Sequence, residues 1–255
     1  MKPKLTEQDL EKLFIVSRSR NRKPELFFIK FFFLFIVISF ALYFLLNFSA
    51  FSAKIAFWYK DQFGSSQTQE LQKVVREAVN SFQTDNASLP NISDNSMSIE
   101  VIGLKAPIAF RVENEENETS KQLKNGLIHL NGTSLPGENG NSFITGHSSN
   151  YPWVKSNYNS VFALLDNVVV GDLIQVKFLD RNYIYRVTEM FVVGPEESNV
   201  LKPYKDKPTL TLMTCTPIGT NLKRLIVRSD QIIPDPATAI PSSASGVTAL
   251  PAGVR

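Results

Sequence analysis

Cys215 is the only cysteine among the 255 residues of the chain, so it cannot form an internal disulfide. It ends a strand-like run, residues 209–215, and Arg224 follows nine residues later. The stretch between them has turn chemistry, so two antiparallel strands joined there would bring the thiol and the guanidinium together. A thiol needs a base or a positive neighbour to become a good nucleophile, and a guanidinium can stabilise an oxyanion or bind substrate backbone. The pattern predicts thiol chemistry; an inert thiol and a surface arginine are the simpler alternatives.

Two histidines, His129 and His147, are the candidates for the base that such a thiol requires. His147 ends an apolar run and precedes polar loop residues, which is where a strand delivers a side chain to the rim of a sheet. His129 lies between apolar neighbours. For each histidine the alternative is a structural ring bonded to the backbone, and the residues alone leave that choice open.

An uncharged and mostly apolar stretch over residues 31–53 is long enough to cross a bilayer, which takes about 20 helical residues. We therefore expect a transmembrane signal anchor over residues 26–53; a buried core helix and a cleaved signal peptide are the alternatives. Basic residues gather before it: Arg18, Arg20, Arg22, Lys23 and Lys30. Such charges stay in the cytoplasm, which predicts a cytoplasmic N-terminus over residues 1–25 and an extracytoplasmic remainder.

Residues 54–95 are expected to form an extracytoplasmic helical stalk and linker. Apolar residues recur every three or four positions over residues 66–83, which predicts one helix face. A polar stretch rich in Asn, Ser, Asp and Pro then indicates a linker. The simpler interpretation of residues 65–83 is a stalk or a helix packed on the domain. The alternative is a regulatory lid over the active site.

From residue 96 to residue 234 the pattern changes to short runs that alternate apolar and polar residues between turns. This pattern predicts a closed, antiparallel-rich β domain, with one short helix near residues 161–165. The tail over residues 235–255 is rich in Pro, Ala, Ser and Gly without periodicity, so we expect it to be disordered. A net charge of +3 with dispersed Lys and Arg does not favour nucleic-acid binding.

The stretch from Ile99 to Val227 resembles a sortase catalytic domain. The matching motifs are Leu135-Pro-Gly-Glu138, Gly140-Asn141, Gly146-His147, Gly171-Asp172, Thr211-Leu-Met-Thr-Cys-Thr-Pro217 and Arg224. The resemblance implies a mostly β fold, an eight-stranded sortase-type barrel with short helices after the transmembrane helix. It also selects His147 over His129.

What the resemblance implies for chemistry is a cysteine transpeptidase. Cys215 would attack a peptide carbonyl within a Leu-Pro-x-Thr-Gly-like sorting signal, His147 would move protons, and Arg224 would hold the substrate and the oxyanion. Thr214 and Pro217 would contact the substrate, and the loop over residues 194–208 would form one wall of its groove. The acceptor would be an amine of a cell-wall precursor or a pilin lysine, and the enzyme would sit in the bacterial cell membrane.

Several alternatives accompany this expectation. The segment around Cys215 and Arg224 is most similar to the pilin-polymerising class C, but the chain has no evident lid motif or C-terminal span, which leaves the subclass open. A membrane-tethered cysteine peptidase that releases to water, and an inactive barrel serving as a surface binding module, are the rival functions. We expect no cofactor and no metal. An acidic run resembles calcium-binding loops of some family members, but a solvated loop is the favoured interpretation: Glu113, Glu115, Glu116 and Glu118.

Overall fold

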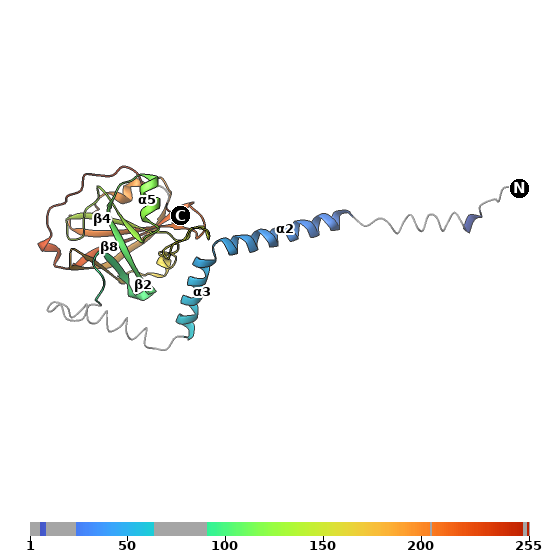
Figure 1. Ribbon diagram of the computed structural model, residues 1–255, viewed down its shortest axis with the longest axis horizontal. Helices are drawn as coiled ribbons and strands as arrows, with labels where there is room; N and C mark the ends of the chain where they lie inside the picture. Colours follow the sequence, from blue (N-terminus) through green and yellow to red (C-terminus); the bar gives the residue numbers. More distant parts are fainter. Residues whose placement is uncertain (1–5, 9–23, 64–90, 205, 252–253, 255) are drawn as a thin grey trace. The chain divides into compact units, whose positions relative to one another are not determined.

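The computed structural model describes residues 6–8, 24–63, 91–204, 206–251 and 254 (Figure 1). The chain divides into two units, residues 1–45 and residues 46–255. The strands are β1 (Ser96–Ile99), β2 (Leu104–Val112), β3 (Leu127–Leu130), β4 (Gly140–Thr145), β5 (Leu173–Phe178), β6 (Arg181–Val193), β7 (Pro208–Thr216) and β8 (Lys223–Ile233). The helices are α2 (Pro24–Leu46), α3 (Phe48–Phe63) and α5 (Glu116–Gln122), with single 3-10 turns η1 (Glu100–Ile102), η2 (Leu165–Asn167), η3 (Ser198–Leu201) and η4 (Pro236–Thr238).

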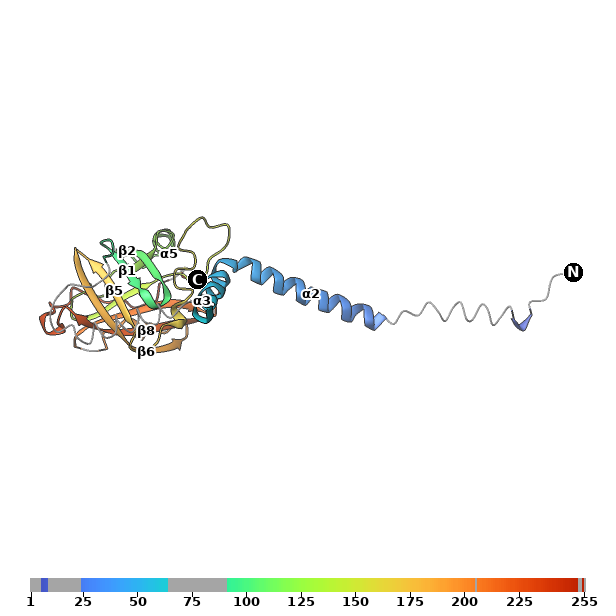
Figure 2. The same ribbon diagram turned by 90° about the horizontal axis from the view of Figure 1, so that it is seen from below.

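The strands close into a barrel in the order β1-β2-β3-β4-β7-β8-β6-β5, which confirms the predicted eight-stranded fold (Figures 1 and 2). Two neighbouring pairs, β2–β3 and β4–β7, are parallel, and the other pairs are antiparallel. The parallel pairing of β4 with β7 matters most for function. It brings the C-terminal ends of both strands, where His147 and Cys215 occur, to the same end of the barrel.

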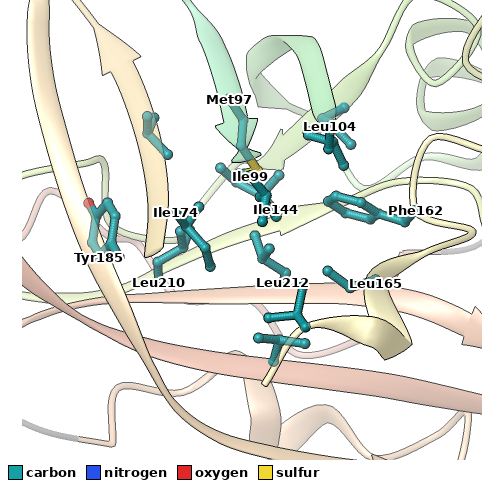
Figure 3. Packing of buried hydrophobic residues seen from close by; sticks show 14 of the residues in the cluster. Met97, Ile99, Leu104, Ile144, Phe162, Leu165, Ile174, Tyr185, Leu210 and Leu212 are labelled. Atoms are coloured by element: carbon teal, nitrogen blue, oxygen red, sulfur yellow. The ribbon is translucent and has the colours of Figure 1, made fainter. Parts of the chain in front are cut away.

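Two apolar clusters lie on opposite sides of the strands because side chains alternate along a strand. The first fills the barrel, and Figure 3 shows Ile144, Leu210 and Leu212 converging in it with residues of β1, β5 and β6. The second cluster lies outside the barrel on β3, β4, β7 and β8, and it contains Met213 and Cys215. The outer face of β7 is therefore as thoroughly covered as the inner face, which sets it apart from an ordinary half-solvated strand.

The N-terminal helix α2 contains one segment, Phe27–Leu46, that is long and apolar enough to cross a membrane, with a mean hydropathy of 2.5. We expected a single span over residues 26–53. The structure instead ends α2 at Leu46, turns at Asn47 and begins α3 at Phe48. Asn favours turns because its side chain competes for backbone hydrogen bonds. The predicted helix over residues 66–83, and with it the possible lid, lies outside the described residues.

The C-terminal tail differs from the expectation of disorder. Ile240 forms a backbone bridge with Glu138, donating its N–H to the Gly137 carbonyl at 3.2 Å and accepting from Asn139 N–H at 2.9 Å. Further along, Gly246 N–H donates to the Gly132 carbonyl at 3.0 Å. Composition did not reveal this docking, because the hydrogen-bond partners belong to loops more than a hundred residues earlier in the chain.

Candidate active site

Cys215 and Arg224 face each other across two antiparallel strands. They are register partners in the β7–β8 ladder, so their Cβ atoms lie about 4.5–5.5 Å apart. Cys215 shares the outer face of β7 with Met213, while Arg224 has the same parity on β8 as Ile226, another member of the outer cluster. The expected turn between them is present, closed by Thr220 N–H donating to the Pro217 carbonyl at 3.1 Å. The structure thus brings together the pair that the sequence placed nine residues apart.

The guanidinium of Arg224 is largely buried yet incompletely bonded. Arg224 is 8% exposed, and its Nη1 donates to the carbonyls of Asn221 at 2.8 Å and Lys223 at 3.2 Å. Nε is buried and has no hydrogen-bond partner among the described residues. A buried donor without an acceptor is costly, by about 1–3 kcal/mol. A substrate carbonyl or an oxyanion on this face of the barrel would satisfy it.

His147 lies two residues beyond the end of β4 and is tied to β7 on both sides. Before it, Gly146 N–H donates to the Met213 carbonyl at 3.3 Å and the Gly146 carbonyl accepts from Thr214 Oγ1 at 2.8 Å. After it, Ser149 Oγ accepts from Gly219 N–H at 2.9 Å, in the turn that joins β7 to β8. Thr145, two residues before His147, pairs with Met213, two residues before Cys215.

Gly146 explains why a glycine must precede this histidine. A Cβ atom there would meet Leu127 Cδ2 at 2.5 Å and Val161 Cγ1 at 2.9 Å, distances that real Cβ atoms do not adopt. The His147 carbonyl accepts from Phe162 N–H at 2.9 Å, and Phe162 belongs to the barrel core. The histidine backbone is therefore fixed directly to the packed interior, which preorganises its ring.

Asn150 is a site residue that sequence reasoning missed. Its Oδ1 accepts from Tyr151 N–H at 2.8 Å, which leaves Nδ2 to donate toward His147 Nε2 at 3.3 Å. An amide that donates to Nε2 favours the neutral ring with its proton on Nδ1. The signal in the sequence was weak: an Asn three residues after a histidine is common in loops, and only the fold shows that the two side chains meet.

His129 has the environment of a structural histidine. It is fully buried, its Nδ1 accepts from Arg111 N–H at 3.4 Å, and its Nε2 lies 2.9 Å from the Ser134 carbonyl. Burial lowers its pKa from 6.5 to about 4, so the ring is neutral at physiological pH. It sits on β3, whereas Cys215 sits on β7 on the far side of β4. The two histidines thus differ both in their position in the barrel and in their hydrogen-bond partners.

Of the two expected substrate contacts, only Pro217 faces solvent, in the turn after β7. Thr214 alternates with Cys215 and is 2% exposed, and its hydroxyl is used by the Gly146 carbonyl. The structure therefore gives Thr214 a different place from the one expected, that of a support for the His147 backbone. In the expected wall over residues 194–208, Val200 and Leu201 of η3 pack in the outer cluster.

The acidic run before and within α5 makes ordinary surface contacts. Glu113 Oε1 accepts from Asn131 Nδ2 at 2.7 Å, and Glu118 Oε1 accepts from Gln122 Nε2 at 2.7 Å. Among the described residues there is no group of three or more His, Cys, Asp or Glu side chains that could hold a metal ion.

Cys215 and Arg224 lie opposite each other on the outer face of the barrel, and the backbone beside His147 is bonded to β7. A thiol supplies an electron pair, an imidazole can accept and return a proton, and a guanidinium can stabilise an anionic oxygen. Such a set suits acyl transfer at a peptide carbonyl through a thioester. That these three residues act together stays a prediction.

Comparison with known proteins gives a consistent result. A family model described as a sortase domain matches residues 97–232, more than half of the chain. A curated relative, sortase A of Bacillus anthracis, is 24% identical over 175 residues, which is 65% of this chain and 77% of the relative.

Solved structures of similar proteins come from several bacteria. A sortase D5 transpeptidase of Clostridium perfringens is 30% identical, with a TM-score of 0.45, covering 71% of this chain and 99% of that one. Sortase A of Corynebacterium diphtheriae, a lid mutant, is 26% identical, with a TM-score of 0.48, covering 66% and 97%. Sortase C1 of Streptococcus agalactiae is 28% identical, with a TM-score of 0.46, covering 66% and 86%.

Proposed function

Because this chain belongs to the sortase family of cysteine transpeptidases, we propose that Cys215, His147 and Arg224 form its catalytic site and act on proteins with a Leu-Pro-x-Thr-Gly-like sorting signal. The observation that carries the assignment is the arrangement of three neighbouring strand ends. Cys215 and Arg224 are cross-strand partners, and the His147 backbone is bonded to the strand and the turn on either side of the cysteine.

In the first half of the proposed reaction, Cys215 gives its thiol proton to His147, and Sγ attacks the carbonyl carbon of the scissile peptide bond. The oxygen becomes an oxyanion, which Arg224 stabilises through a donor such as its unpartnered Nε. The C–N bond then breaks, His147 passes the proton to the leaving amine, and a thioester remains on Cys215. The ring is then neutral again, the form in which Nε2 accepts from Asn150 Nδ2.

In the second half, an acceptor amine replaces the departed peptide. His147 takes a proton from the amine as its nitrogen attacks the thioester carbonyl, and the C–S bond breaks to restore the cysteine. We propose that the amine comes from a cell-wall precursor or a pilin lysine. The product is a surface protein joined by a new amide bond.

We also propose that α2 anchors the enzyme in the bacterial cell membrane. The segment Phe27–Leu46 has the length and hydropathy of a span, and basic residues lie on its N-terminal side. The barrel would then lie outside the cell, where sorting signals are presented. Protease treatment of intact spheroplasts tests this: the barrel should be digested, and the mass of the membrane-bound protein should retain residues 1–46.

The test of the reaction uses the full chain in detergent, a library of Leu-Pro-x-Thr-Gly peptides and a mixture of amines, followed by mass spectrometry. We expect a thioacyl adduct on Cys215 that transfers to an amine, and none in Cys215→Ala. An adduct that yields only hydrolysed peptide in the presence of cell-wall and pilin amines would favour the peptidase alternative. An adduct that survives in His147→Ala but fails in His129→Ala would overturn the assignment of the base.

A further inference from the structure

The last part of the chain runs along the outside of the barrel toward the catalytic cysteine. After the bridge at Ile240, Ser243 donates from both N–H and Oγ to Glu138 Oε2, at 3.0 Å and 2.8 Å. Glu138 is 6% exposed, and Leu135 N–H donates to the same oxygen at 2.9 Å. Ser242 Oγ meets Ser134 Oγ at 2.7 Å. Ser242 and Ser243 are exposed, and their hydrogen bonds tie the segment to the buried residues Ser134 and Glu138. Both views in Figures 1 and 2 place the C-terminal part of the chain against the barrel.

Beyond Gly246 the tail enters the outer apolar cluster that contains Cys215. Val247 and Leu250 pack against this cluster, and Val247 lies so close to Gly132 that a Cβ there would come within 2.8 Å of its Cγ2. Asn114 Nδ2 donates to the Ala249 carbonyl at 2.8 Å. Two side chains and one backbone carbonyl therefore hold this part of the tail on the barrel.

The tail reaches the nucleophile itself. Cys215 Sγ donates to the Val254 carbonyl oxygen at 2.9 Å, and Val254 is 3% exposed within the same cluster as Cys215. A peptide carbonyl at the sulfur is the contact that a substrate must make before attack. The thiol is 1% exposed with this occupant in place.

The sequence that leads to Val254 reads Leu250-Pro251-Ala252-Gly253-Val254. It shares the Leu-Pro pair with a Leu-Pro-x-Thr-Gly-like signal, and it differs at two positions, with glycine in place of threonine and valine in place of glycine. Two other Leu-Pro pairs occur in the chain, Leu89-Pro90 and Leu135-Pro136. Neither is followed by a small residue and then glycine; Leu135-Pro136 is followed by Gly137-Glu138.

We propose that the described end of the tail, residues 247–251 and 254, is an intramolecular ligand of the active site, bound in the place of a substrate peptide, which a sorting signal must displace. The proposal rests on the proposed function, since it assigns the covered face as the place where Leu-Pro peptides bind. A tethered peptide has an effective concentration in the millimolar range, so it can occupy the site even when its intrinsic affinity is weak.

A labelling experiment tests occupancy without any sorting signal. Cys215 is the only thiol, so its rate of reaction with a bulky maleimide in the full chain reports access to the site. Val247→Ser with Leu250→Ser removes two apolar anchors and should raise the rate by about tenfold or more. Thr248→Ser, an exposed neighbour on the same segment, is the matched control and should leave it unchanged.

The second arm tests whether the occupant is recognised as a Leu-Pro peptide. The synthetic peptide Val-Thr-Ala-Leu-Pro-Ala-Gly-Val-Arg should slow labelling of the double variant, and the same peptide with Ala-Ala for Leu-Pro should not. Protection by the peptide also shows that the variant is folded, because an unfolded chain labels at the rate seen in denaturant. Equal labelling of wild type and double variant would overturn the proposal, and so would protection by both peptides alike.

The activity arm separates this proposal from the proposed function. With a Leu-Pro-x-Thr-Gly peptide and an amine, the double variant should show a lower KM than wild type and an unchanged kcat. If no peptide is transferred by any variant but labelling still depends on the Leu-Pro peptide, the proposed reaction fails while the tail remains a ligand. A KM that is unchanged while labelling rises would overturn the competition between tail and substrate.

Discussion

The surroundings of His129 and His147 differ in a way that burial alone does not reveal. Both residues are buried: His129 is 0% exposed and His147 is 3% exposed. His129 is held through both ring nitrogens by backbone groups of β2 and of the loop after β3, so its neutral form is fixed by the fold. His147 is held by its own backbone, and its ring accepts at Nε2 from the side chain of Asn150.

This comparison teaches that the kind of partner separates a structural histidine from a functional one. Backbone partners on both nitrogens leave a ring no freedom to exchange a proton with a substrate. A ring whose position is set by the main chain, with an adaptable amide at Nε2, can change its protonation state while it stays in place. The following predictions test that contrast, from the largest expected effect to the smallest.

His147→Ala should lower kcat/KM for transpeptidation by about 10³-fold, because the base that moves protons to and from the amines is lost. Its free energy of unfolding should change by less than about 1 kcal/mol, since the ring is not part of the apolar core. Steady-state assays and chemical denaturation of the full chain in detergent measure both quantities. A variant that keeps its activity but loses more than about 3 kcal/mol of stability would place His147 with His129 in the structural group.

His129 should dominate the acid response of barrel stability. Its folded pKa is about 4, below the unfolded value of 6.5, so between these values the unfolded state binds more protons. Stability is therefore fully present above pH 6.5 and is lost as the pH falls toward 4, by about 3 kcal/mol in all. His129→Gln, which can still donate to the Ser134 carbonyl, should flatten this dependence and retain kcat. Denaturation curves of wild type and His129→Gln at several pH values measure this dependence. Equal slopes of stability against pH in the two proteins would show that His129 is not the group responsible.

Arg224→Lys should lower kcat by about 10²-fold, as expected when a preorganised oxyanion donor is lost. Lysine keeps the charge but not the planar set of donors, one of which is the unpartnered Nε. Arg228→Lys is the matched control. Arg228 lies four residues further along β8, where its Nη1 pairs with Glu189 Oε1 at 2.9 Å. A similar loss in both variants would mean that general positive charge, rather than the position opposite Cys215, carries the effect.

The sequence predicted much of this architecture because its strong signals are local. Alternation over residues 96–234 predicted a closed β domain, a barrel or a sandwich, and the resemblance implied the eight-stranded barrel. The turn between Cys215 and Arg224 predicted their pairing. The Gly-His pair was identified by resemblance, and its physical reason is the close packing of Gly146 on Leu127 and Val161. Neither of those neighbours could be named before the strands were placed.

What the sequence did not predict depends on contacts between distant segments. The tail was expected to be disordered because low periodicity and high Pro, Ser and Gly content describe the segment and not its partners. Glu138, which holds Ser243, lies 105 positions away. Thr214 was assigned to the substrate because it adjoins the cysteine, but alternation along β7 turns it to the other face. Likewise, the hydrogen bond between Asn150 and His147 depends on the path of the loop after β4, which the sequence does not reveal.

The smallest predicted effect concerns Asn150. It tests whether the side-chain partner of the His147 ring contributes to activity. Asn150→Ala removes the donor at His147 Nε2 and should lower kcat/KM by about fivefold, the scale of one modest hydrogen bond. Asn150→Gln should restore part of the loss. The free energy of unfolding of Asn150→Ala should change by less than about 1 kcal/mol, since the contact joins two side chains of the same loop. A loss of activity that accompanies a larger loss of stability would mean that Asn150 supports the loop and not the ring of His147.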